Sequence, residues 1–238
     1  RLGALEDVER SESEGIGLRV FVGQRSASIS TSDFSPEGFA ELAVRAVEMA
    51  RLAPEDRYAG LAPAELLMMG DVPDLDLNDQ HEPTPTELRE RALAAEDAAR
   101  AVPGVTNSNG GGAGFGRSVV ALVTSHGFAR GYGATSHSLS ASVVGGEGGG
   151  MQTDYEMRSA RYAADLPVPE LIGAEAGRRT VARLNPTSMK SGKVPVVFDP
   201  RVGSGLLGHL IGAMSGPSVA RKSSFLIGRE DEQLFDSA

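Results

Sequence analysis

The sequence predicts an α+β fold in which antiparallel sheets are built from hairpins and helices are inserted between them. Two observations carry this prediction. Several segments alternate apolar and polar residues on either side of a short turn sequence, which is typical of hairpins with one solvated face. The helical segments do not alternate singly with strands, as a doubly wound parallel sheet would require. The 238 residues, of which 40% are hydrophobic, suffice for one large domain or two small ones.

Residues 1–70 are predicted to form an N-terminal region with a hairpin and a helix. The expected elements are a candidate strand at Leu2–Arg10, a hairpin at Gly15–Asp33 with its turn at Gly23-Gln24, and a helix that begins after Ser35 and ends at Pro54. Ser35 is a favourable N-cap and Pro36 fits the first helical turn. The acidic, proline-bearing residues 71–85 are predicted to be an irregular linker whose aspartates are solvated rather than bound to metal.

Residues 86–192 are predicted to form a central α+β region, and residues 193–238 the start of a C-terminal region. The central elements expected are a helix at Thr86–Val102, a glycine-rich turn at Val105–Gly116, a hairpin at Arg117–Ala134 with its turn at Ser125-His126-Gly127, a strand at His137–Val144, a turn at Gly145–Gly150, a strand at Met151–Ala164 and a helix at Pro169–Leu184. The C-terminal elements expected are a buried strand at Lys193–Phe198, a helix from Val202 or Gly203, and a strand at Ser223–Ile227.

Composition excludes several classes of partner and site. The formal net charge of −9 argues against nucleic-acid and anionic-membrane partners, because both need a basic surface. No apolar run approaches the roughly 18 residues that a membrane helix requires. The absence of cysteine rules out disulfides and thiolate metal ligands in this sequence and fits a reducing cytoplasm. None of the four histidines lie four residues apart, so no H-x-x-x-H zinc pair exists.

The run Gly203-Ser204-Gly205-Leu206-Leu207-Gly208 matches G-x-G-x-x-G. A dinucleotide-binding loop needs a strand, a tight turn and a helix, with an acidic residue about 20 positions later. Here four residues separate the expected strand from the first glycine, and Glu230 is the first acidic residue afterwards. A nucleotide-binding oxidoreductase is therefore kept only as a minor alternative. The glycine tracts 110–116 and 145–150 lack the lysine of a P-loop, and no G-x-S-x-G hydrolase elbow exists.

The order of short motifs along the chain resembles the TldD/PmbA family, and more closely its PmbA (TldE) branch. The resemblance covers essentially all 238 residues. The stretches that carry it are Ser32–Pro36, Pro73–Leu77, Thr106–Gly111, Ser125–Gly127, His137–Ser140, Asp154-Tyr155, Gly173–Glu175 and Gly205–Ala213 leading to Arg221-Lys222-Ser223. Each motif alone is weak, whereas their order and spacing together are specific. The family's proteins are longer, so the resemblance implies that this sequence lacks the N-terminal start and the C-terminal half.

The resemblance implies a two-subunit peptidase system in which a TldD-like subunit carries H-E-x-x-x-H on a helix and cuts peptides with zinc. When that helix is aligned, the first histidine falls on Gly208, the glutamate on His209, the shared glycine on Gly212 and the second histidine on Ala213. A catalytic zinc needs about three protein ligands and a carboxylate that takes the water proton. Gly208 and Ala213 offer no donor atom, so no metal or catalytic residue is expected here and zinc is expected in the partner.

These observations lead to three hypotheses. In the first, the chain is a PmbA/TldE-like subunit without catalytic residues that helps a cytoplasmic TldD-like peptidase to bind and process unfolded peptide, with peptide lying along a sheet edge. His209, Arg221 and Lys222 are then the candidate contacts with peptide or partner. In the second, the chain is itself a metallopeptidase that uses ligands from a following C-terminal half together with His209. The third is the oxidoreductase with nucleotide bound at Gly203–Gly208.

Overall fold

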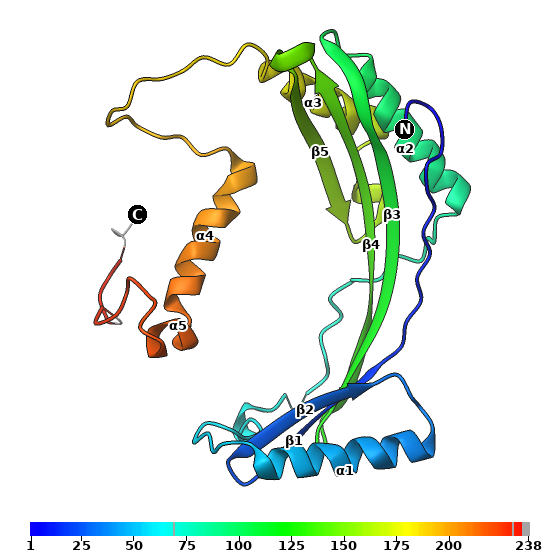
Figure 1. Cartoon of the computed structure of the whole chain (residues 1–238). Coiled ribbons are helices and arrows are strands. Elements are labelled where there is room, and N and C mark those ends of the chain that lie inside the picture. The colour runs from blue at the N-terminus through cyan, green and yellow to red at the C-terminus, as the bar shows by residue number, and fades with distance from the viewer. Residues whose placement is uncertain (69, 230, 235–238) are drawn as a thin grey trace. The chain divides into compact units, whose positions relative to one another are not determined.

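The computed structural model describes residues 1–68, 70–229 and 231–234, and Figure 1 shows its elements. The chain divides into two units, Arg1–Pro186 and Thr187–Ala238. The first unit holds two antiparallel sheets and three α-helices, and the second holds two helices. This arrangement confirms the predicted α+β class with antiparallel hairpins.

The first sheet is the predicted N-terminal hairpin. Strands β1 (Ile16–Val22) and β2 (Arg25–Thr31) pair antiparallel around the turn at Gly23-Gln24, and helix α1 (Pro36–Leu52) follows. Ser35 caps α1 by accepting a hydrogen bond from the Gly38 N–H at 3.0 Å, as predicted. The candidate strand at Leu2–Arg10 is wrong, because that stretch is irregular and exposed. Alternating apolar and polar residues do not form a strand by themselves, because a neighbouring strand must supply the backbone hydrogen bonds.

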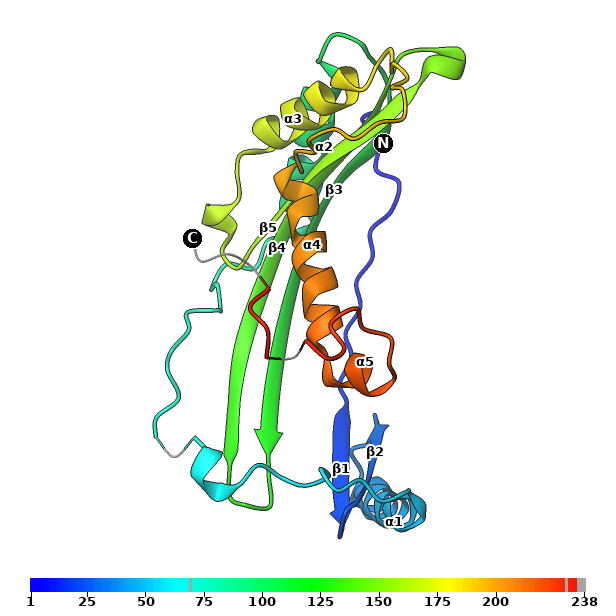
Figure 2. The same cartoon turned by 90° about the vertical axis from the view of Figure 1, so that its left-hand side faces the viewer.

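The second sheet has three strands in the order β3 (Val105–Val123), β4 (Ala129–Gly145) and β5 (Gln152–Ala160). Helices α2 (Pro85–Arg100) and α3 (Pro169–Ala182) pack against each other and cover one face of this sheet (Figure 2). The core between them is small, and half of its buried members are alanines. Its buried members are Ala95, Ala99, Leu139, Ala141, Val143, Leu166, Ile172 and Ala176.

The prediction of a glycine-rich turn at Val105–Gly116 is wrong, because this stretch is the first half of strand β3. One reason is the close approach of α2: a Cβ at Gly111 would lie 2.1 Å from the Ala92 carbonyl oxygen. On the strand's other face a Cβ at Gly114 would lie 2.9 Å from Ser138 Oγ. The glycines therefore serve close packing inside a sheet rather than a change of chain direction.

Strands β3 and β4 continue well beyond the end of β5, which pairs only with His137–Gly145. The turn of this long hairpin lies at Thr124–Phe128, where the sequence predicted it. The extension carries exposed apolar side chains along both strands. They include Val119, Val120, Leu122, Val123 and Tyr132.

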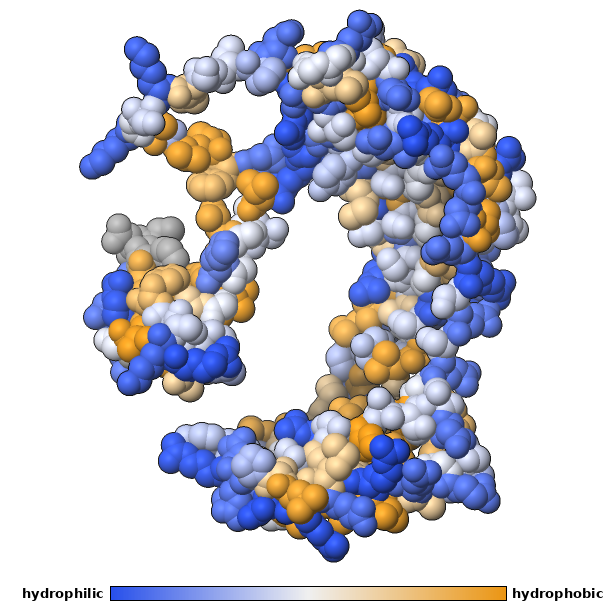
Figure 3. Space-filling model, in the orientation of Figure 1, coloured by the Kyte–Doolittle hydropathy of each residue, from blue (hydrophilic) through white to orange (hydrophobic). Residues whose placement is uncertain are grey.

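The second unit contains helices α4 (Pro200–Met214) and α5 (Gly216–Ala220). The strands predicted at Lys193–Phe198 and Ser223–Ile227 are wrong, since both stretches lack strand structure. Val197 is 94% exposed, so the apolar run that suggested a buried strand has no partner among the described residues. Figure 3 shows apolar side chains on the surface of this unit. Among the residues that the structure describes, none of the helices has the length and apolar character of a membrane span.

Candidate functional site

Helix α4 carries the positions that the resemblance aligns with the family's metal motif. Asp199 caps it by accepting a hydrogen bond from the Arg201 N–H at 2.9 Å, and Pro200 occupies the first turn. Gly203–Gly208 lies entirely within this helix, and no strand leads into it. A dinucleotide loop needs a tight turn at these glycines. The structure therefore does not support nucleotide binding at this run.

The four positions aligned with the family's metal motif all lie on α4, within an arc of about 140° around the helix axis. An α-helix turns by about 100° per residue, so Gly208 and Ala213 project about 140° apart. Gly208, His209 and Gly212 are exposed, whereas Ala213 is 7% exposed and its carbonyl oxygen accepts a hydrogen bond from Ser224 Oγ at 2.7 Å. The two positions that would hold ligands carry no donor atom. Across the described part of the chain, no cluster of three histidine or carboxylate side chains could hold a metal ion.

The predicted contact residues lie at two separate points of the second unit. His209 is an exposed residue in the middle of α4. Arg221 follows the last residue of α5, and Lys222 has a backbone φ of +58°, and both are exposed. No hydrogen bond or ion pair links His209 with either of them in the ranges that the structure describes. Their role in contacting peptide or partner stays a prediction.

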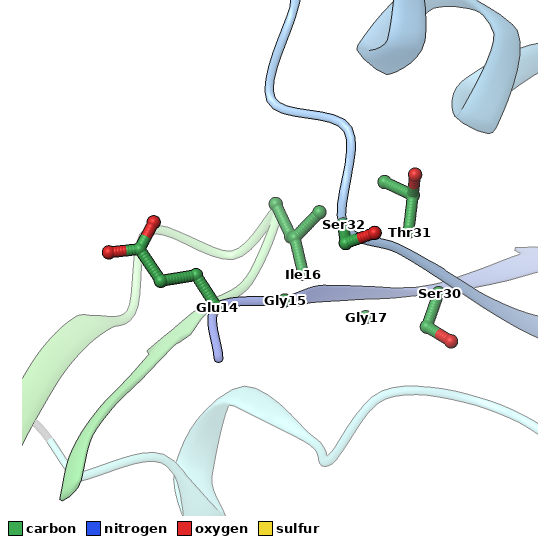
Figure 4. A pocket seen from close by; sticks show the side chains of 7 residues that line it. All are labelled: Glu14, Gly15, Ile16, Gly17, Ser30, Thr31 and Ser32. Carbon is green, nitrogen blue, oxygen red and sulfur yellow. The ribbon is translucent and has the colours of Figure 1, made fainter. Parts of the chain in front are cut away.

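A hollow lies at the open ends of β1 and β2, with a volume of about 630 Å³ (Figure 4). Its lining consists of Glu14, Gly15, Ile16, Gly17, Ser30, Thr31 and Ser32. The lining offers one carboxylate and three hydroxyls but no imidazole or amine beside them. A nucleophile needs a base within hydrogen-bond reach, so this lining does not form a catalytic pair by itself.

A polar cluster that sequence reasoning missed lies where the linker meets the second sheet. Asp79 of the linker is 8% exposed, and its carboxylate accepts hydrogen bonds from the Ala163 N–H at 2.8 Å and the His81 N–H at 2.9 Å. Its Oδ2 lies 3.1 Å from Nε2 of His137 on β4. The hydrogen bond from Ala163, followed by that from His81, lowers the pKa of Asp79.

The imidazole of His137 is almost fully enclosed in this cluster. Its side chain is 3% exposed, and the rings of His81 and Phe115 lie 6.5 Å and 5.0 Å from its own, centroid to centroid. Burial lowers the pKa of His137, and the nearby Asp79 carboxylate opposes that effect only in part. The linker was expected to be solvated throughout, and this part of it is not.

Three family models match successive parts of the chain. The PmbA/TldA metallopeptidase domain 1 matches residues 1–50, the central domain of that family matches 78–184, and its C-terminal domain matches 191–238. The chain belongs to the PmbA/TldD family. The C-terminal match includes all of α4, so the positions aligned with the metal motif lie within the region that the family model covers.

Curated PmbA relatives extend the comparison. The chain is 40% identical to the metalloprotease PmbA of Escherichia coli O157:H7 over 235 residues, which are 98% of this chain and 52% of that protein. It is 34% identical to the PmbA homolog of Haemophilus influenzae over 235 residues, with 98% and 52% covered. The chain thus spans about half the length of the curated relatives it matches.

Solved structures of PmbA/TldD-like proteins share the fold. A Bacteroides thetaiotaomicron protein described as a candidate modulator of DNA gyrase superposes with a TM-score of 0.84 at 28% identity, covering 92% of this chain and 51% of that one. TldE from Thermococcus kodakarensis superposes with a TM-score of 0.69 at 23% identity, covering 88% and 47%. At that lower identity the likeness concerns the fold alone.

Proposed function

We propose that this chain is part of a PmbA/TldE-like subunit that does not cut peptides itself and works in the cytoplasm with a TldD-like peptidase. The observation that carries the proposal is the side-chain chemistry of α4. Gly208 and Ala213 stand where the resemblance places two metal-binding histidines, and neither has an atom that binds zinc. His209 alone supplies one imidazole, whereas a catalytic zinc needs about three protein ligands.

The subunit's contribution in this proposal is to hold unfolded peptide for its partner. Strand β3 supports this role because it is the outer strand of the second sheet. Among the described residues, no backbone hydrogen bond joins the stretch 111–123 to a segment other than β4 and its turn. An extended peptide can add to such an edge through main-chain hydrogen bonds alone, and such binding tolerates many sequences.

The test uses the full-length protein, alone and mixed with a TldD-like subunit. We expect no stoichiometric zinc in the isolated protein by elemental analysis and cleavage of unfolded peptides only in the mixture. The variant His209→Ala should leave metal content unchanged, with Ser204→Ala on the same helix as its matched control. Tight zinc at one equivalent together with peptidase activity of the isolated protein would refute the proposal.

A second candidate function is that the full-length protein is an active metallopeptidase. It is favoured by the name metalloprotease that the PmbA relatives carry and by the half of their length that this chain does not span. In that case ligands outside this sequence would join His209, and His209→Ala would abolish both zinc binding and activity. The same pair of measurements therefore separates the two candidates.

A further inference from the structure

Strand β3 has a long unprotected edge on the side away from β4, residues 111–123, here termed the outer edge. Folded proteins usually protect such an edge with proline, charged side chains or bulges, because its unpaired backbone groups can otherwise recruit another chain. The outer edge contains no proline and a single charged residue, Arg117. The two irregularities in the pairing of β3 lie before it, between Val105 and Gly110. The outer edge is therefore suited to accept a further strand.

Glycine occupies every second position in the first part of the outer edge, at Gly112, Gly114 and Gly116, here termed the glycine row. Ala113, between the first two, packs against the core that α2 and α3 cover. Because side chains alternate between the two faces of a strand, the glycine row lies on the opposite, open face of the sheet. Across the described residues, a Cβ at Gly112 or Gly114 would lie within 4 Å only of a serine hydroxyl of β4, and a Cβ at Gly116 would meet nothing within that distance.

The glycine row has no covering side chain from its own sheet. A large side chain on a neighbouring strand, an aromatic one above all, can shield the backbone of an edge glycine. The β4 residues paired with the row are Ser140, Ser138 and Ser136, which are too short to do so. Gly116 has no positive φ and has free space beside it, so nothing in the described chain requires glycine there. A covering side chain would therefore come from a strand added at the outer edge.

The open face beside the glycine row is uncharged. Next to the serines of β4, strand β5 presents Tyr155 and Met157 on this face, and they are 54% and 55% exposed. The charged residues of β5 alternate with them and point to the other face, where Glu156 pairs with Arg179 of α3. A charged side chain laid over the row would find no opposite charge among these residues, so the surface favours apolar side chains.

We propose that the outer edge binds an extended peptide whose large apolar side chains, at every second position, lie over Gly112, Gly114 and Gly116. This inference rests on the proposed function, since it gives the unfolded peptide a place on this subunit and names the peptides that fit it best. Main-chain hydrogen bonds supply affinity for any sequence. Each covered glycine should improve binding by roughly twofold, which amounts to about tenfold for all three.

Two peptides of equal composition test this preference on the full-length protein without a TldD-like subunit. Each has seven residues of threonine and phenylalanine between solubilising lysines. Phenylalanine occupies the second, fourth and sixth positions in the alternating peptide, and the third, fourth and fifth in the blocked peptide. By fluorescence anisotropy the alternating peptide should bind about tenfold more tightly. Equal affinity of the two peptides would overturn the proposal.

N-methylation of the alternating peptide tests whether it binds as a strand. The threonine amides point to one edge of an extended peptide and the phenylalanine amides to the other. Methylating one of these two sets should abolish binding, because it removes the donors that face β3, whereas methylating the other set should leave binding intact. Binding that survives both modifications would show that the peptide does not add to the sheet.

The variant Gly116→Asp assigns the preference to the glycine row, since it adds a carboxylate where a Cβ has free space. It should bind a peptide with lysine in place of one alternating phenylalanine at least about twofold more tightly than the parent peptide, whereas the unmodified protein should show the reverse order. Gly17→Asp on β1, where a Cβ also has free space, is the matched control and should keep the unmodified order. Gly112→Asp serves if Gly116→Asp does not fold. A folded row variant that keeps the unmodified order would contradict the proposal.

Hydrogen exchange of the full-length protein distinguishes the peptide from other occupants of the outer edge. Without peptide, alternate amides of residues 111–123 should exchange rapidly, and the alternating peptide should protect them. If these amides are already protected, the rest of the protein or a second copy covers the edge, and the proposal is wrong. Zinc content and cleavage test the partnership with a TldD-like subunit separately, so a failure of that partnership and a failure of the peptide preference give different results.

Discussion

The close approach of α2 and α3 gives a quantitative test of the packing. Gly173 of α3 sits on α2 so closely that an added Cβ would lie 2.0 Å from the Ala95 carbonyl oxygen and 2.9 Å from Ala98 Cβ. The nearest obstruction is backbone, which cannot rotate aside as a side chain can. The variant Gly173→Ala therefore forces α2 and α3 apart, and it does so over the alanine core that both helices share with the sheet.

Two contributions of opposite sign determine how much Gly173→Ala changes the free energy of unfolding. Overpacking of a well-packed site costs about 1–3 kcal/mol, and a clash with backbone belongs at the upper end. Alanine is the better helix former by about 1 kcal/mol, which offsets part of that cost. We expect a net loss of about 2 kcal/mol in the free energy of unfolding. For a chain of this size that loss lowers the melting temperature by about 4–8 °C.

Urea unfolding followed by far-ultraviolet circular dichroism measures the change, since the sequence contains no tryptophan for fluorescence. Ala174→Gly, at the exposed neighbouring position of α3, isolates the propensity term and should cost about 1 kcal/mol. Gly177→Ala should be milder than Gly173→Ala, because its closest backbone atom, the Ala99 carbonyl oxygen, lies at 2.8 Å. A Gly173→Ala variant that is more stable than the unmodified chain would refute the packing argument.

Two further substitutions probe other contacts. The carboxylate of Glu156 is 3% exposed and forms ion pairs with Arg158 and Arg179. Glu156→Gln removes its charge and should lower the free energy of unfolding, measured by urea titration, by about 3 kcal/mol. A change under about 0.5 kcal/mol would mean that these ion pairs make no net contribution to stability. In the capping box of α2, Thr84 Oγ1 and the Glu87 carboxylate each accept a hydrogen bond from a backbone N–H. Thr84→Ala breaks this box and should lower the free energy of unfolding by about 0.5–2 kcal/mol, with a loss of helical signal on partial unfolding. Equal stability of Thr84→Ala and Thr84→Ser would contradict that assignment.

The parts of the fold that the sequence predicted well are those decided by local chemistry. The cap at Ser35, the turn at Gly23-Gln24 and the turn at Ser125–Gly127 are each specified by a few adjacent residues. Helix α2 begins slightly earlier than predicted, because the Thr84-x-x-Glu87 capping signature sets its start. That signal is also local, and the sequence alone contains it.

The errors arose where the deciding neighbour lies far away in the sequence. The glycines of 110–116 suggested a turn, but their strand structure depends on α2 and on the serines of β4. The apolar run at 193–198 suggested a buried strand, but a strand needs a partner and none of the described segments pairs with it. The composition of a segment indicates which secondary structure it can form, but it does not identify the segment with which it pairs.

The polar cluster around Asp79 and His137 shows the same limit. Asp79 lies in an acidic, proline-bearing stretch, and its isolated chemistry is that of a solvated surface carboxylate. It becomes buried because the linker crosses the end of β5 and brings it against His137, 58 positions further along the chain. No periodicity connects the two residues. The positions on α4 that align with the metal motif are the opposite case, because residue identity alone shows that Gly208 and Ala213 have no side-chain donor atom. The absence of donor atoms at two positions can thus be read from the sequence, whereas a contact between distant segments requires the fold.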